Sequence, residues 1–256
     1  MGQEKSNTSF LQSGGKSTGI GTAENVTINN LIQSSTGDLI NTANDERELL
    51  RQIRLYKELG IVNCAGELKG TQLEPIRCMK AVHTSLSFMG VGGEKWIKDA
   101  QLQKAFENML IRTGTMGGEV RFLLINPASG SYGSLYRLRG ESVPYDSYER
   151  YAELVKKYDN LKVHLYSDMP SFRMQFVDET YLAISRYYFD KMSHDDSGGG
   201  WKTPHLIISA EQREYGKDEV RYKGSLYGSF LLAYNFIWSH SQSIQKWADE
   251  GKIFNK

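Results

Sequence analysis

The segment EVRFLLI, at residues 119–125, is the most informative stretch of the sequence for the fold. Apart from Glu119 and Arg121 it is continuously apolar, which is typical of a strand that is buried on both faces. Such strands belong to parallel sheets, because the helices that connect parallel strands cover both sides of the sheet. The segment therefore predicts an α/β core built around parallel strands.

Strand and helix patterns alternate on either side of this segment. Strands are predicted at 85–91 and 161–166, and an amphipathic helix is predicted at 94–113. Residues 127–143 are rich in Gly and Ser and are expected to form a loop, after which Pro144 begins a helix that runs to Tyr158. Strands joined by helices favour right-handed crossovers and a parallel arrangement.

The second half of the chain adds strands that follow one another closely. Residues 172–177 and 181–187 are predicted strands, and the turn at 178–180 between them indicates a hairpin. A further strand is expected at 204–209 and one long helix at 218–247. The expected order is β-α-β-α-β-β-β-β-α, which predicts a mixed sheet with helices on both faces.

The first part of the chain is more polar. Residues 25–32 alternate polar and β-branched side chains, as in a short strand that could join a sheet edge of its own or of another subunit. A flexible tail is the alternative. Helices are predicted at 45–60 and 71–83. The expected organisation is a polar arm at 1–40, a helical lead-in at 41–84 and an α/β domain at 85–256.

Charge and composition exclude several classes of protein. The chain of 256 residues carries 31 Lys and Arg against 30 Asp and Glu, so a generalised electrostatic grip on nucleic acid is not expected. It has no apolar run long enough to span a membrane and no signal-peptide pattern at its start, so a cytoplasmic location without membrane contact is expected. The two cysteines, Cys64 and Cys78, form no metal-binding or disulfide pattern, and neither a metal nor a cofactor is expected.

Residues 171–178 read SFRMQFVD. Together with the element order from 85 to 247, they resemble the phospholipase D superfamily, whose signature is H-x-K-x-x-x-x-D. The spacing is kept, but Ser171 stands at the histidine position and Arg173 at the lysine position, while Asp178 matches the aspartate. The resemblance implies a site for a phosphate ester. Because the histidine nucleophile is absent, it supports binding better than catalysis.

Strand geometry supports a phosphate site at Arg173 independently of the family resemblance. Alternate residues of a strand point to the same side, so Ser171 and Arg173 should share a face, and the guanidinium can offer several donors to a phosphate. We expect it to face an open concavity at the rim of the sheet. A serine hydroxyl needs a positioned base before it can act as a nucleophile. The alternative role for Arg173 is an ion pair with Asp178 that braces the hairpin.

Other residues are weaker candidates. His164 lies on the predicted strand before Ser171, and His205 lies at the start of the predicted strand at 204–209, so both could approach the same end of the sheet and serve as a base or a ligand contact. A histidine that is hydrogen-bonded within or beside the sheet is the more common case. Two loops at strand ends could present N–H groups to an anion, or could be ordinary turns. The full set of candidate ligand-binding positions is Ser171, Arg173, Asp178, Gly90, Gly92, Gly93, position 94 at the start of the following helix, Asn126 and Ser129.

Three functions remain open from the sequence. The first is an altered phospholipase D-like module that binds a nucleotide or phosphate ester and acts as a sensor or effector, in keeping with degenerate relatives in prokaryotic regulatory and defence systems. The second is an active phosphodiesterase or nuclease that works as a dimer, with His164 or His205 replacing the missing nucleophile. The third is a structural, oligomer-forming protein with a vestigial pocket. The expected partners are a phosphate-bearing small molecule or nucleic-acid end and further copies of the chain.

Overall fold

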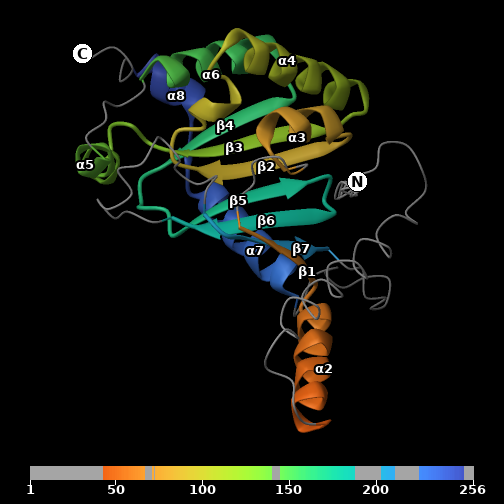
Figure 1. Cartoon of the computed structure of the whole chain (residues 1–256). Coiled ribbons are helices and arrows are strands. Elements are labelled where there is room, and N and C mark those ends of the chain that lie inside the picture. Colours follow the sequence, from red (N-terminus) through yellow and green to blue (C-terminus); the bar gives the residue numbers. More distant parts are fainter. Residues whose placement is uncertain are drawn as a thin grey trace, which may run out of the picture.

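The described residues form an eight-stranded mixed sheet with helices on both faces (Figure 1). The computed structural model describes residues 43–66, 71, 73–139, 145–187, 203–210 and 225–250. Across the sheet the strands follow the order β1-β7-β6-β5-β2-β3-β4-β8. Their bounds are β1 (Ile61–Ala65), β2 (Ser85–Gly90), β3 (Glu119–Ile125), β4 (Leu161–Tyr166), β5 (Phe172–Val177), β6 (Tyr181–Arg186), β7 (His205–Ser209) and β8 (Gln242–Ser243).

The strand directions confirm the predicted mixed α/β class. β2, β3 and β4 are parallel neighbours, as the segment at 119–125 and its flanking helices predict. β5, β6 and β7 form an antiparallel meander that pairs with β2 through β5. The helices are α2 (Ala43–Glu58), α3 (Pro75–Ala81), the short 3-10 helix η1 (Glu94–Trp96), α4 (Ala100–Thr115), α5 (Gly130–Arg139), α6 (Tyr145–Lys157), α7 (Leu226–Ser239) and α8 (Ile244–Asp249).

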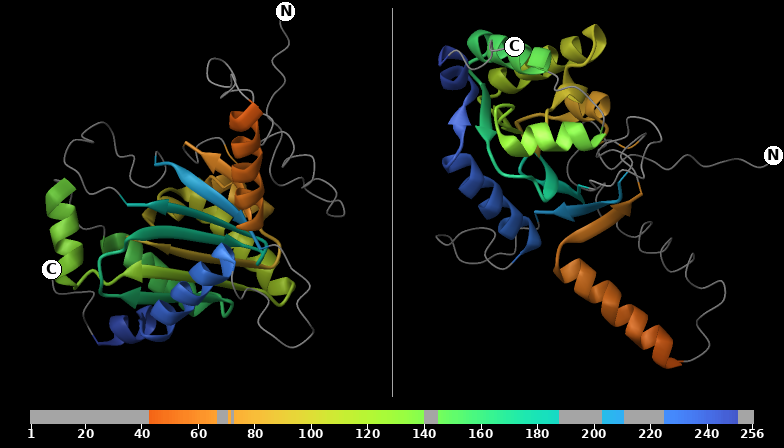
Figure 2. Two further views of the ribbon diagram at one scale, coloured as in Figure 1. Left: turned by 90° about the horizontal axis from the view of Figure 1, so that it is seen from below. Right: turned by 90° about the vertical axis from the view of Figure 1, so that its left-hand side faces the viewer.

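The two faces of the sheet are covered by different helices (Figures 1 and 2). On one face, Phe122 of β3 packs against Phe106 of α4 and Tyr151 of α6, and we call this the α4 face. On the other, Phe176 of β5 packs against Tyr227 and Tyr234 of α7, and we call this the α7 face. Because successive strand residues point to opposite faces, the register of the sheet assigns every strand residue to one of the two.

Four elements differ from the prediction for local reasons. α3 is shorter than 71–83 because Pro75 occupies its first turn, where its missing N–H costs nothing. The helix expected at 94–113 is divided, and Asp99 caps the second part by accepting from the N–H of Leu102. β1 is an unpredicted edge strand that pairs with β7, so the lead-in contributes to the sheet. The expected loop at 127–143 instead contains α5.

The long helix expected at 218–247 is also interrupted. α7 ends at Ser239, and the chain then forms β8, which pairs with β4 at the sheet edge. Ser243 caps α8 by accepting from the N–H of Lys246. Residues 25–32 lie outside the described residues, so the proposed arm stays a prediction. Among the described helices, none combines the length and apolar character needed to cross a membrane.

Candidate functional site

The residues with the strongest claim to a site form a row across three strands on the α4 face. Arg173 of β5 pairs directly with Ser185 of β6. The register of β6 with β7, in which Ile184 pairs with Leu206, continues to place Ser185 beside His205. Opposite residues in antiparallel strands point to the same side, so the three side chains lie next to one another. We call them the Arg173 row.

Arg173 is placed by apolar neighbours. It is only 4% exposed, and its guanidinium carbon lies 5.5 Å from the centre of the Phe88 ring, within the range of a cation–π contact. Burial lowers the pKa of the guanidinium, while the nearby Tyr187 and Cys78 favour the charged form. The expectation that Arg173 faces an open concavity is therefore wrong. It lies in the interior among Phe88 of β2, Tyr187 after β6 and Cys78 of α3.

Ser185 and His205 complete the row with unsatisfied polar atoms. They are 4% and 2% exposed, and neither the Ser185 Oγ nor either ring nitrogen of His205 has a hydrogen-bond partner of standard geometry in the described part of the chain. The pKa of His205 is lowered to about 4, first by burial and then by the positive charge of Arg173, while a weaker hydrogen-bond interaction with the Thr203 backbone raises it. The imidazole is therefore neutral near pH 7. Buried polar groups without partners are rare and costly.

His164 lies on the opposite side of the sheet. It pairs in register with Leu123, which belongs to the α7 face. Its ring stacks on Trp238 at a centroid distance of 4.0 Å, and its Nδ1 is 3.0 Å from the Oγ of Ser241. Burial lowers its pKa. The structure thus separates His164 from Arg173, and the expectation that both histidines approach one end of the sheet is wrong for His164.

Ser171 and Asp178 also lie apart from the row. Ser171 is exposed just before β5, and its carbonyl accepts from the N–H of Tyr187. Asp178 follows the other end of β5, about 16 Å along an extended strand from Arg173. The ion pair expected between Arg173 and Asp178 therefore does not form.

The carboxylate of Asp178 instead holds the start of β2. It accepts from the backbone N–H groups of His83, Thr84 and Ser85 at 2.7–3.0 Å, and from the Thr84 hydroxyl at 3.2 Å. These donors occupy both oxygens, since the His83 N–H lies 3.0 Å from each of them. Asp178, which matches the aspartate position of the family motif, is thus a structural residue that connects the hairpin to the loop after α3.

The glycine loop after β2 packs under tyrosines. The carbonyl of Gly90 accepts from Tyr166, and that of Gly93 accepts from Tyr151. A side chain at Gly90 would meet the Tyr187 hydroxyl at 3.0 Å, and one at Gly92 would meet two further tyrosine hydroxyls at 3.4 Å. The inclusion of position 94 among the phosphate contacts is wrong, because this residue is Glu94 and its carboxylate accepts from Tyr136. An anion would be repelled there.

The loop after β3 forms a turn and a helix cap. The Asn126 side chain accepts from the N–H of Ala128, as in an Asx turn. The Ser129 hydroxyl accepts from the N–H of Tyr132 at the start of α5. Both candidate side chains therefore have local structural partners, and α5 places Tyr132 and Tyr136 against the glycine loop.

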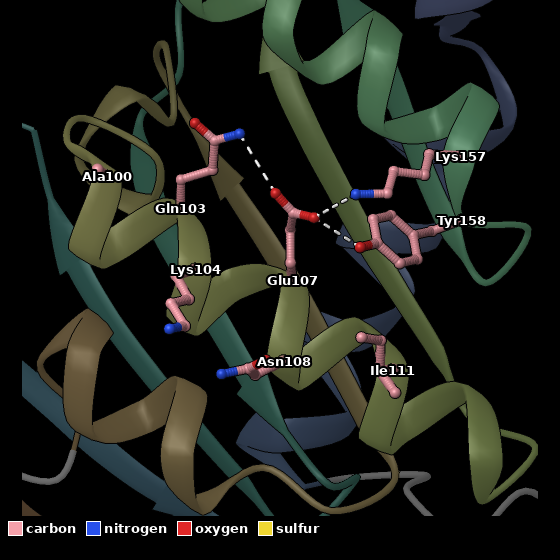
Figure 3. A pocket seen from close by; sticks show the side chains of 8 residues that line it. All are labelled: Ala100, Gln103, Lys104, Glu107, Asn108, Ile111, Lys157 and Tyr158. Atoms are coloured by element: carbon pink, nitrogen blue, oxygen red, sulfur yellow. Dashed lines mark hydrogen bonds and ion pairs between the residues drawn. The ribbon is translucent and has the colours of Figure 1, made fainter.

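A separate surface pocket of about 660 Å³ lies between α4 and α6 (Figure 3). At its centre, Glu107 accepts from Lys157 and Tyr158, each at 2.6 Å, and from Gln103 at 3.3 Å. These contacts lower the pKa of Glu107, with Lys157 the largest cause. The pocket contains no member of the Arg173 row, and its carboxylate already has three donors. Its lining is Ala100, Gln103, Lys104, Glu107, Asn108, Ile111, Lys157 and Tyr158.

In the described ranges, no group of three or more His, Cys, Asp or Glu side chains could hold a metal ion.

Sequence reasoning missed Ser185, although the hairpin register leads to it directly. Once residues 178–180 form the turn, Val177 faces Tyr181 and Arg173 must face Ser185. The Tyr187 hydroxyl, which accepts from the N–H of Val91, was also not foreseen.

Comparison with known proteins gives distant structural similarities only. No protein-family model and no curated protein matches the chain. Among solved structures, the chain is similar to Nuc from Salmonella typhimurium, a phospholipase D family member, with 13% identity, a TM-score of 0.36 and coverage of 68% of this chain and 90% of that one. Nuc thus belongs to the family that residues 171–178 resemble.

Two further structures cover more of the chain. TrmBL2, an archaeal chromatin protein with a novel mode of DNA binding, shares 14% identity at a TM-score of 0.39, covering 84% of this chain and 67% of that one. Phosphatidylserine synthase from Haemophilus influenzae Rd KW20 shares 13% identity at a TM-score of 0.43, covering 83% and 53%. At such low identities and TM-scores, these proteins say nothing about the activity of this chain.

Proposed function

We propose that the chain is a phospholipase D-like module that binds a nucleotide or another phosphate ester through the Arg173 row and acts as a sensor or effector in a prokaryotic regulatory or defence system. The observation that carries the proposal is the pair of buried, unsatisfied side chains beside a buried cation. Ser185 and His205 hold polar atoms without partners in the described chain, and both adjoin Arg173.

An anionic ligand suits this arrangement on three counts. The guanidinium, the serine hydroxyl and a ring N–H of the histidine are all donors, and phosphate oxygens are acceptors. Hydrogen bonding to a ligand would remove the cost of leaving the Ser185 and His205 atoms unsatisfied. A negative charge would also offset the unfavourable effect of Arg173 on a protonated His205. A cationic ligand would be repelled by Arg173 and would face donors rather than acceptors.

Binding is better supported than hydrolysis. A general base works best with a pKa near the working pH, whereas the pKa of His205 is lowered to about 4. The second candidate function, a phosphodiesterase that works as a dimer, depends on His205, because this is the histidine that adjoins Arg173. The third, a structural protein with a vestigial pocket, draws support from the burial of Arg173.

The test is ligand binding by variants that keep the fold. Inorganic phosphate, nucleoside monophosphates and triphosphates, and a 5′-phosphorylated oligonucleotide would be screened by thermal shift and calorimetry. Stabilisation should be lost in Ser185→Ala and His205→Gln, which leave Arg173 in place, and should persist in the exposed-site control Arg54→Gln. The same samples would be assayed for phosphodiester hydrolysis, and turnover that His205→Gln abolishes would favour the enzyme. If no compound stabilises the wild type at millimolar concentration, the proposal is refuted.

A further inference from the structure

α7 is a surface helix with an unusual composition. Its sequence, LYGSFLLAYNFIWS, contains no Asp, Glu, Lys or Arg in 14 residues. One side is buried, where Tyr227 and Tyr234 pack on Phe176 of β5. The other side keeps Leu232 63% exposed and Phe236 65% exposed. A surface helix normally carries polar or charged residues on its outer side, so this composition calls for a second contact.

The outer side of α7 has a regular pattern of large and small residues. Ser229, Leu232, Ala233 and Phe236 follow the spacing i, i+3, i+4 and i+7, which places them along one face of a helix, and all four are exposed. The apolar surface continues onto the sheet through Phe172, which is 38% exposed and packs edge-on against Phe230. Figure 2 shows α7 on the outside of the sheet, opposite α4 and α6.

We propose that the chain forms a homodimer in which two copies of α7 pack antiparallel along this stripe. A twofold axis between residues 232 and 233 would bring Phe236 of one copy against Ser229 of the other, and Leu232 against Ala233. Each large side chain thus faces a small one, twice, as an isologous interface requires. No other twofold register of the four residues pairs both large side chains with small ones.

The electrostatics of α7 favour a second copy over other partners. A twofold interface brings identical surfaces together, so charges near the axis repel, and α7 has none. A nucleic acid would find no cation on this helix to neutralise its phosphates. Helices that lie on lipid surfaces carry Lys or Arg along their polar side, and α7 lacks these as well. What remains is an apolar, uncharged partner surface, which α7 itself supplies.

The available area fits a dimer of moderate affinity. An aromatic side chain offers about 150–250 Å², so Phe236, Phe172 and Leu232 of two copies would together bury on the order of 600 Å² of apolar surface. The smallest specific interfaces bury about 1,200 Å² in total, of which somewhat more than half is apolar. The flanking small and polar residues of α7 would supply the remainder. The dimer should therefore dissociate on dilution.

The register of the two α7 helices can be tested by disulfide formation between introduced cysteines. The background variant is Cys64→Ser, which removes the exposed cysteine and keeps the fully buried Cys78. Residues 233 of the two copies would lie only about 1.5 Å apart along the helix axis, so Ala233→Cys should form a crosslinked dimer. Ser229→Cys alone should not, because its two copies would be separated by about 10 Å. A mixture of Ser229→Cys and Phe236→Cys chains should crosslink as a heterodimer.

Sedimentation or light scattering would measure the dimer itself. Leu232→Glu should yield a monomer at a concentration where the wild type is dimeric, with an unchanged circular dichroism spectrum because the site is exposed. The control Ile111→Glu places the same charge at a 57% exposed apolar residue of α4 and should leave the dimer intact. A wild type that is monomeric at about 100 μM, or equal crosslinking by Ala233→Cys and Ser229→Cys alone, would overturn the proposal. Phosphate binding on the α4 face is independent of either result.

Discussion

Replacing Asp178 should destabilise the protein because one carboxylate connects two distant segments. Its oxygens accept from three consecutive backbone N–H groups and from the Thr84 hydroxyl. A hydrogen bond to a charged group contributes about 1.5–3 kcal/mol net, but these four share one acceptor group and several donors can be rehydrated. We therefore expect Asp178→Ala to lower the free energy of unfolding by about 2–4 kcal/mol, without additivity over the four bonds.

The backbone at this position allows the contributions to be separated. Asp178 has φ 50°, in the left-handed region, where an alanine costs about 1–2 kcal/mol and glycine does not. Asp178→Gly should therefore report the lost hydrogen bonds alone and be less damaging than Asp178→Ala. Asp178→Asn keeps one acceptor oxygen in a residue that tolerates this conformation, so its loss should be about half that of glycine.

Urea unfolding measured by circular dichroism gives the free energies, and a loss of this size moves the midpoint by on the order of 1 M. The matched control is Glu179→Ala, because Glu179 is the exposed neighbour with φ 54°. Because glutamate and alanine both carry a Cβ, this substitution leaves the backbone strain unchanged and removes none of the bonds to Asp178, so it should be nearly neutral. If Asp178→Gly unfolds within about 0.5 kcal/mol of the wild type, the connecting role assigned to this carboxylate is refuted.

Three further predictions concern Gly118, His205 and Arg112. Gly118→Ala should lower the free energy of unfolding by more than about 3 kcal/mol or prevent folding, because its Cβ would lie 1.7 Å from the Thr84 carbonyl oxygen. The control Gly117→Ala has nothing within 4 Å of its Cβ and should cost about 1 kcal/mol for its φ of 71°. Thermal unfolding of the two variants would measure the difference. The folded-state pKa of His205, about 4, lies below the ordinary histidine pKa of 6.5, so the unfolded chain binds the proton first, and the free energy of unfolding should fall by about 3 kcal/mol as the pH drops from 6.5 to 4. His205→Gln should lose this pH dependence in urea titrations, and a retained slope would contradict the assignment. Arg112→Ala should destabilise by about 2 kcal/mol, because its guanidinium donates to the Met79 and Val82 carbonyls at the end of α3. Arg112→Lys keeps the charge but loses the forked set of donors, so it should be nearly as damaging, and a lysine that restores full stability would contradict the role of the fork.

Local pattern was enough for the core strands and for the hairpin. The apolar run at 119–125 and the helices around it predict the parallel β2-β3-β4 unit, because burial on both faces and crossover connections are visible in sequence. The hairpin turn at 178–180 also fixes its register, and with it the contact between Arg173 and Ser185. The motif at residues 171–178 lies on one strand of the hairpin, whereas Ser185 lies on the other strand and has no motif of its own to indicate it.

The parts that failed depend on contacts between distant segments. Strand alternation gives the side on which Arg173 lies but not what surrounds it there, and its neighbours include Phe88 of β2 and Cys78 of α3. The break after α7 has no Gly or Pro to announce it, because β8 forms by pairing with β4. α5 was read as a loop for its Gly and Ser content, although Tyr132, Leu135 and Tyr136 already follow helical spacing.

The burial of the Arg173 row has a consequence for how tightly any ligand can bind. Because Arg173, Ser185 and His205 are each at most 4% exposed, a phosphate group can reach them only in a state in which part of the cover has moved. If that state is populated to about 1%, the apparent dissociation constant is about 100-fold higher than the intrinsic one. A substitution that loosens the cover without replacing a member of the row, such as Phe88→Leu, should then raise phosphate affinity while lowering stability. Affinity that falls together with stability would show that Phe88 holds Arg173 in its binding position rather than shielding it.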